Sequence, residues 1–121
     1  MKNTYLRIGN YVYVESEKQV AKVQSILNDC IYTNWGTHSI PFCEPIPLTE
    51  DWLLRFGWKR YGIFTNQLYI TNGIITLVSS KDFCIDMEIE GQLLPINHIK
   101  YIHQLQNLYY ALTGAELTQT T

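Results

Sequence analysis

The residues best suited to binding chemistry form a short basic and aromatic run in the middle of the chain. Cations pair with phosphate and aromatic rings stack on bases, so such a run suits a nucleotide or a single-stranded nucleic acid. The alternative is that Trp58 belongs to the hydrophobic core and that the cations are solvated. The candidate ligand-binding residues of this run are Arg55, Trp58, Lys59, Arg60 and Tyr61.

Polar residues near the C-terminus offer a second candidate ligand-binding site. His103, Gln104 and Asn107 would form a polar ledge on a predicted helix, and the alternative is an ordinary polar helix surface. His98 lies five positions before His103, which separates the two side chains by about 140° around a helix axis. We therefore do not expect them to share one metal ion, as an i, i+4 pair can.

Carboxylates alternate along one predicted strand. Asp86, Glu88 and Glu90 would project from the same side of that strand. Two of them could hold Mg²⁺, because hard oxygen ligands suit that ion, and such a site would support a small metal-dependent hydrolase. The alternative, which we favour, is a solvated face that protects a sheet edge or meets a basic partner.

The cysteines and the histidine between two of them do not have the spacing of a metal site. Zinc sites commonly pair ligands two to four residues apart, whereas Cys30, His38 and Cys43 are more widely spaced. A nucleophilic Cys–His pair would have to form in space rather than in sequence. We expect reduced thiols in the core, and we predict no metal ion and no cofactor.

No sequence motif announces an enzyme. The chain has no glycine-rich phosphate loop and no GxSxG, HExxH or EF-hand pattern. We therefore predict a protein without catalytic residues. Aromatic side chains are common in protein interfaces, and a group of them near the N-terminus favours a homodimer. The candidate interface residues are Tyr11, Tyr13 and Trp35, with Tyr32 on the same aromatic surface.

Length and composition describe a folded protein. The chain has 121 residues, of which 46% are hydrophobic and 17% are charged. Its net charge of −2 makes nucleic acid an unlikely partner and argues against adhesion to an anionic membrane. No apolar segment has the length of a membrane span, and the N-terminus lacks the pattern of an export signal. We therefore expect a cytoplasmic protein.

The predicted fold is α+β and mostly antiparallel β. The first 47 residues suggest a small barrel-like or curled sheet, because short β-prone runs alternate with polar turns. Three prolines between Pro41 and Pro47 then predict an extended connector. We treat residues 1–121 as a single compact domain with 1–47 and 48–121 as possible sub-units. The expected strands are Leu6–Val14, Val20–Leu27, Cys30–Thr33 and Thr37–Phe42.

A short helix and a β-meander are predicted after the connector. Thr49 is the expected N-cap of a helix over Thr49–Phe56. The meander occupies Trp58–Glu90, where Asn72-Gly73 predicts a two-residue hairpin turn. Asp82–Glu90 alternates like a half-buried strand.

A loop, a helix and a tail complete the predicted fold. The loop covers residues 91–96 and is closed by Pro95. The C-terminal helix begins at Asn97 or His98, ends at Thr113 and covers one face of the sheet structure. The polar tail over 115–121 is expected to fray.

Three stretches of the chain resemble one protein family. They are LRIGNYVYV at 6–14, PIPLTEDWLLRFGW at 45–58 and IKYIHQLQNLYYALTGAEL at 99–117, about a third of the chain. Together they resemble small uncharacterised proteins from gut anaerobic bacteria and their phages. The resemblance implies an accessory protein of a phage or mobile element that acts inside a bacterial host cell. It transfers no catalytic residue, and it includes a counter-defence role among the functions to consider.

Binding rather than catalysis is therefore the predicted function. The target would be a host protein or a nucleotide-like small molecule, which the protein would sequester. One alternative is a nucleic-acid-binding module that uses Arg55–Tyr61. A less favoured alternative is a metal-dependent hydrolase that uses Asp86 and Glu88.

Overall fold

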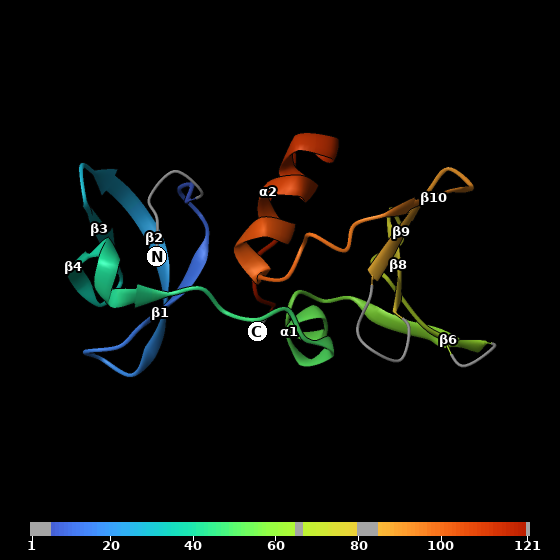
Figure 1. Ribbon diagram of the computed structural model, residues 1–121, viewed down its shortest axis with the longest axis horizontal. Coiled ribbons are helices and arrows are strands. Elements are labelled where there is room, and N and C mark those ends of the chain that lie inside the picture. Colours follow the sequence, from blue (N-terminus) through green and yellow to red (C-terminus); the bar gives the residue numbers. More distant parts are fainter. Residues whose placement is uncertain (1–5, 65–66, 80–84, 121) are drawn as a thin grey trace. The chain divides into compact units, whose positions relative to one another are not determined.

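The described residues form two compact units, each built on its own five-stranded antiparallel sheet (Figure 1). The structure, a computed structural model, describes residues 6–64, 67–79 and 85–120. The first unit combines the chain up to Leu48 with Lys100–Thr118, and the second combines Thr49–Ile99 with the last residues from Gln119. The predicted α+β class with mostly antiparallel strands is confirmed.

The sheet of the first unit is curled and carries the strand order β4-β3-β2-β1-β5. Its first four strands are β1 (Tyr11–Val14), β2 (Gln19–Leu27), β3 (Cys30–Thr33) and β4 (Gly36–Ser39). Successive residues of a strand point to opposite faces, so one face of this sheet can be fully apolar. That face forms a buried core of Val12, Val14, Ala21, Val23, Ile31, Ile40 and Cys43.

The first part of the proline-rich stretch packs with this sheet, so the predicted extended connector is limited to the residues that follow β5. Ile40–Phe42 forms a 3₁₀ turn (η2), and Cys43–Glu44 forms β5 at the sheet edge beside β1. The fourth predicted strand therefore ends at Ser39. Pro41 lies in η2 and Pro45 follows β5, so neither proline has to donate a ladder hydrogen bond. Prolines exclude a central strand but tolerate a short edge strand.

The C-terminal helix α2 spans Ile102–Thr113 and begins later than predicted. Its N-cap is Tyr101, which also forms a β-bridge with Pro47. Oε1 of Gln104 accepts hydrogen bonds from the backbone N–H groups of Lys100 (2.8 Å) and Tyr101 (3.0 Å). These bonds fix the N-cap of the helix at Tyr101, whereas the sequence predicted a cap at Asn97.

The end of α2 is the predicted one, but the tail is not frayed. Gly114 takes a left-handed φ of 74°, and its N–H donates to the carbonyl of Tyr110. Beyond it, Leu117 is buried and Thr120 donates to the carbonyl of Arg55. The tail contains a buried apolar side chain that anchors it, which the polar composition of 115–121 obscured.

The contacts of α2 group it with the N-terminal sheet. We expected this helix to cover a sheet face, and β1 is the strand that it contacts. Neither helix in the described ranges is long and apolar enough to cross a membrane.

The second unit begins with helix α1 (Glu50–Arg55), which has the predicted end signals. Oγ1 of Thr49 accepts a hydrogen bond from the N–H of Trp52 at 3.3 Å. Glu50 and Asp51 place negative charge in the first turn, where the helix dipole favours it. Gly57, with a φ of 87°, lets the chain leave the helix.

The sheet of the second unit is a meander with the strand order β10-β9-β8-β7-β6. Its buried residues include Ile70, Leu77, Ile85 and Met87. The sequence also predicts turns at Asn66-Gln67 and Ser79–Lys81. These turns, and the start of the strand predicted from Asp82, fall partly outside the described residues. The strands are β6 (Lys59–Phe64), β7 (Gln67–Thr71), β8 (Thr76–Ser79), β9 (Ile85–Ile89) and β10 (Gln92–Pro95).

The hairpin at Asn72 is longer than predicted. Thr71 pairs with Thr76, so four residues rather than two form the loop. Oδ1 of Asn72 accepts hydrogen bonds from the N–H groups of Ile74 and Ile75, both at 3.0 Å. Asparagine therefore shapes the loop through its side chain, as in an Asx turn, and β8 begins later than the predicted strand.

A two-residue hairpin lies instead at Glu90-Gly91. Both residues have positive φ values, 52° and 80°, and the flanking residues Ile89 and Gln92 are paired. These are the features of a type I′ turn. The predicted loop at 91–96 is thus mostly β10, and Glu90 belongs to the turn rather than to the strand face.

Candidate functional site

The two arginines of the basic run form ion pairs within the second unit. Arg60 forms an ion pair with Glu50 of α1. Arg55 forms an i, i+4 pair with Asp51 at 3.1 Å, and its guanidinium lies 4.9 Å from the centroid of the Trp52 ring. Anion binding at these two arginines would therefore compete with carboxylates that are already in place.

Trp58, the aromatic residue of this run whose side chain the structure describes, is less accessible than a stacking platform requires. Trp58 is 2% exposed and belongs to the core. Lys59 is exposed at the start of β6. The side chain of Tyr61 lies outside the described residues. The structure does not place an exposed aromatic ring of this run beside its cations in the part of the chain that it describes.

The three polar residues predicted to form a ledge on α2 have separate roles. His103 is 3% exposed, and its ring stacks on Tyr101 at 5.9 Å between centroids. Burial lowers the pKa of His103 below its usual range. Gln104 caps the helix, while Asn107 accepts hydrogen bonds from Asn10 Nδ2 (2.8 Å) and Arg7 Nε (3.2 Å).

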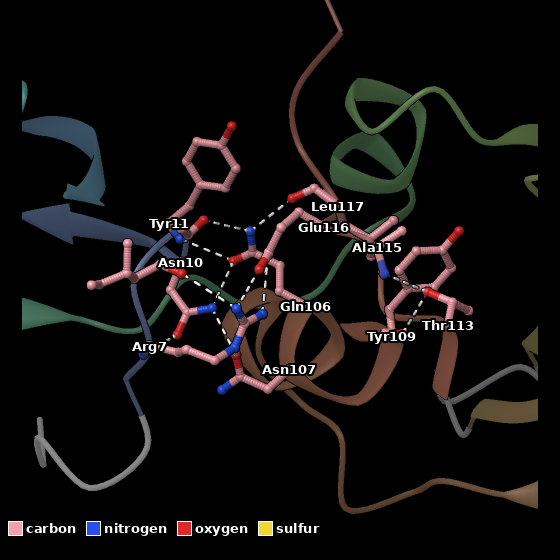
Figure 2. A network of polar contacts seen from close by, with 12 residues as sticks. Arg7, Asn10, Tyr11, Gln106, Asn107, Tyr109, Thr113, Ala115, Glu116 and Leu117 are labelled. Carbon is pink, nitrogen blue, oxygen red and sulfur yellow. Dashed lines mark hydrogen bonds and ion pairs between the residues drawn. The ribbon is translucent and has the colours of Figure 1, made fainter. Parts of the chain in front are cut away.

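A buried polar network centres on Gln106, a residue that the sequence pattern did not single out (Figure 2). Gln106 is fully buried. Its Oε1 accepts from the N–H of Tyr11 at 2.9 Å, and its Nε2 donates to the carbonyls of Gly9 (3.0 Å) and Leu117 (2.9 Å). The side-chain amide thus replaces a neighbouring strand along the start of β1, where β5 does not reach.

An ion pair closes the exposed side of this network. Arg7 pairs with Glu116 of the tail (Figure 2). Its guanidinium lies 4.2 Å from the centroid of the Tyr110 ring. The hydrogen bond from Arg7 to Glu116 raises the pKa of the guanidinium further. The hydrogen bonds of the network lie within the first unit, where they join the start of β1, α2 and the tail.

The three carboxylates of the predicted acidic face do not all lie on one strand, because the last of them is in a turn. Asp86 and Glu88 project from β9 and are half-buried, whereas Glu90 is exposed in the turn. Among the described residues, no group of three or more histidine, cysteine or acidic side chains is placed to hold a metal ion.

Cys30, His38 and Cys43 are also separated. His38 faces Ile31 across the β3–β4 ladder, so it lies on the core side of the sheet, and Cys30 lies on the opposite side. Cys43 is buried in the core, where burial raises the pKa of its thiol and keeps it protonated. Cys43 Sγ donates to the carbonyl of Ser39.

The side of the first sheet opposite its core carries exposed apolar residues, and we call it the outer face. The strand register identifies its members, because residues that are directly opposite each other on neighbouring strands project from the same face. Tyr13 is opposite Val20, and Leu27 is opposite Cys30. Leu27 is 59% exposed, and Tyr32 and Trp35 are each 43% exposed. The outer face comprises Tyr13, Val20, Leu27, Tyr32 and Trp35.

Trp35 is held in a fixed position on the outer face. It occupies the two-residue turn between β3 and β4, and its Nε1 donates to the carbonyl of Val20 at 3.2 Å. Beside it, Oδ1 of Asn34 accepts from the N–H of Lys22 at 3.1 Å. The side chains at the hairpin tip therefore form hydrogen bonds with backbone groups of β2, in the part of that strand that extends beyond β3. The indole keeps its apolar face in solvent with its only donor already bonded.

The candidate interface residues from the sequence have different exposures. Trp35 is exposed, Tyr13 is half-buried, and Tyr11 is buried at 8% exposure. Leu27 was missed because it appeared to be an ordinary apolar strand residue. The bulge between Val23 and Ser25 turns Leu27 away from the core, because an extra residue reverses the alternation, and this bulge is visible only in the strand pairing.

No protein-family model matches the chain, and no curated protein or solved structure is significantly similar to it.

Proposed function

We propose that this protein is a non-catalytic binding module that recognises a partner protein through the outer face of its N-terminal sheet. The observation that carries the proposal is Trp35, an indole that is exposed but fixed by its hydrogen bond to Val20. An exposed ring that is already immobilised loses little conformational entropy on binding. Tryptophan and tyrosine are also the residue types that most often dominate binding energy in protein interfaces.

The surroundings of Trp35 favour a protein over a nucleotide as the partner. The outer face offers a leucine, a valine and three aromatic rings, and the charged residues that the strand register places on the same side are Lys22 and Glu44. Phosphate recognition normally requires several unpaired cations. In the described residues, both arginines of the basic run are in ion pairs.

The cellular setting of the proposal comes from the resemblance to proteins of gut bacteria and their phages. We place the protein in the cytoplasm of a bacterial host cell, where it would bind and sequester a host protein. A counter-defence role belongs to this setting. The proposal assigns no catalytic residue, metal ion or cofactor.

The test is partner capture with the full chain immobilised, using lysate of the producing bacterium and variants of the outer face. Tyr32→Ser and Leu27→Ser should each reduce the captured partner several-fold, and neither side chain has a hydrogen bond to lose in the described structure. Phe42→Ser is the matched control, because Phe42 is 69% exposed in η2 of the same unit but lies outside the outer face. Circular dichroism should show that all three variants fold.

The salt dependence of the captured complex distinguishes the alternatives. An apolar interface should hold in moderately high salt, whereas a nucleic-acid complex should weaken steeply. Equal capture by the wild type and both outer-face variants would overturn the proposal. A nucleotide-sized mass increment in native mass spectrometry, unaffected by Tyr32→Ser, would favour a small-molecule target instead.

A further inference from the structure

Strand β10 is an unprotected edge of the meander. It is the last strand of the sheet, and all four of its residues, Gln92–Pro95, are exposed. It carries no charge, and Leu93 and Leu94 are 56% and 45% exposed. The opposite edge, β6, starts with the cations Lys59 and Arg60, a usual protection against strand pairing.

The hydrogen-bond pattern shows which backbone groups of β10 are available. In an antiparallel ladder, hydrogen-bonded and non-hydrogen-bonded pairs alternate. Ile96 donates to Ile85 at 3.0 Å, so the pairs Leu94–Met87 and Gln92–Ile89 are also hydrogen-bonded ones. The N–H and C=O groups of Leu93 and the C=O of Pro95 therefore point away from β9. Pro95 occupies a position where its missing N–H would have faced outward.

We propose that β10 pairs antiparallel with β10 of a second copy of this chain, with Leu93 opposite Leu93. In this register the two leucines exchange two backbone hydrogen bonds across a two-fold axis. Gly91 then lies opposite Pro95, where the glycine N–H can reach the outward proline carbonyl. Gln92 lies opposite Leu94, so no like charges meet along the strand pair.

A second copy suits this edge because the contact is self-complementary. A two-fold pairing uses the same edge of both chains and closes, leaving no β10 edge for further addition. The absence of charge on β10 removes the repulsion that two copies of the β6 edge would experience. The pair would merge two meanders into one continuous sheet and would present two outer faces to a partner, which raises avidity.

The first test is the oligomeric state of the full-length protein by sedimentation equilibrium over a wide concentration range. The wild type should form a concentration-dependent dimer. Leu93→Lys places like charges opposite each other at the axis, and Leu93→Pro removes the outward N–H without breaking a bond to β9. Both variants should be monomeric at concentrations where the wild type is dimeric.

Ile74→Lys is the matched control, because Ile74 is 62% exposed in the loop before β8, away from this edge. This variant should dimerise like the wild type, and so should Tyr32→Ser, which alters only the outer face. A monomeric wild type at every concentration would overturn the proposal, and so would a dimer that survives both Leu93 substitutions. A monomeric protein whose β10 edge pairs with a strand of a different protein would also overturn it.

Amide hydrogen exchange measured by NMR gives the register directly. The Leu93 N–H should gain protection as the protein concentration rises, because it bonds only in the dimer. The Leu94 N–H bonds to Met87 within one chain and should be protected at all concentrations. A dimer in which the Leu93 amide exchanges at its monomer rate would contradict the proposed pairing.

Discussion

Gln106 places its entire side-chain amide inside the first unit, where it joins β1, the turn at Gly9 and the tail. The N–H of Tyr11 and the carbonyl of Leu117 meet the amide of Gln106 in buried hydrogen bonds, and each such group costs about 1–3 kcal/mol when left without a partner. A glutamine in this position is therefore a structural residue of the sheet, although it belongs to a helix.

Gln106→Leu should lower the free energy of unfolding by at least about 2 kcal/mol, since leucine fills similar space but pairs with none of these groups. Urea unfolding followed by circular dichroism measures the change. Gln24→Leu is the control, because Gln24 is exposed on β2 and its loss should change stability little. Equal midpoints for the two variants would show that the network contributes nothing to stability.

The same residue illustrates why site prediction from sequence is limited. Helical periodicity predicts an apolar stripe on α2 that includes Ile102, Leu105, Tyr109 and Leu112. The first three are buried, whereas Leu112 is 48% exposed. Gln106 and His103 are equally buried, but a polar residue gives no periodic signal that distinguishes a satisfied interior position from solvent. The prediction that Asn107 binds a ligand arose for the same reason. Its hydrogen-bond partners Asn10 and Arg7 lie about a hundred positions away in the sequence, so no local pattern reveals them.

At the level of elements, the sequence predicted strands and helices more accurately than the turns between them. Helix α1 has its predicted cap and end because those signals are local. Two hairpins of the meander, at Asn72-Gly73 and Glu90-Gly91, were misjudged because turn type depends on register, which is set by long-range packing. Asn72-Gly73 has the strongest turn composition, yet Glu90-Gly91 adopts the two-residue turn.

Glu90→Asn should stabilise the β9–β10 hairpin, because asparagine tolerates the left-handed φ of 52° better than glutamate does. We expect a gain of about 0.5 kcal/mol, measured as a shift in the urea midpoint. Gly91→Ala is the opposing variant. It should destabilise by about 1–2 kcal/mol through strain alone, because the added methyl would meet no atom within 4 Å. A destabilised Glu90→Asn protein would refute the assignment of a type I′ turn.

For the whole molecule, a curled N-terminal sheet and a later meander were predicted, but the sequence did not decide whether the two share one sheet, nor which segments make up each unit. The proline-rich stretch suggested a division near residue 47, and the first unit does change to the second after Leu48. No local sequence pattern near Lys100 predicts that the chain returns to the first unit there. This return depends on Pro47 pairing with Tyr101 and on Ile102 donating to the carbonyl of Ile46.

Acid should destabilise the whole molecule through His103. Burial holds its folded-state pKa below the ordinary value of 6.5, so the unfolded chain takes up the proton first as the pH falls. The free energy of unfolding should therefore be constant above about pH 7.5 and decrease from there to pH 5.5, where Asp and Glu are still largely ionised.

Thermal unfolding across this pH range checks the expectation. His103→Phe should flatten the profile, because it removes the titrating group and keeps an aromatic ring beside Tyr101. His98→Gln is the control, because His98 is exposed, and its profile should match that of the wild type. A slope that persists in His103→Phe would assign the pH dependence to another group.

The Gln106 network also affects the order in which the newly made chain can fold. Its hydrogen bonds join residues more than ninety positions apart, from Gly9 and Tyr11 to the far end of the chain. The N-terminal sheet leaves the ribosome first, but its first strand lacks part of its hydrogen bonding until α2 and the tail are synthesised. Domains otherwise tend to fold in the order of their synthesis. Here the unit that is begun first can be completed only after the whole of the meander has been translated.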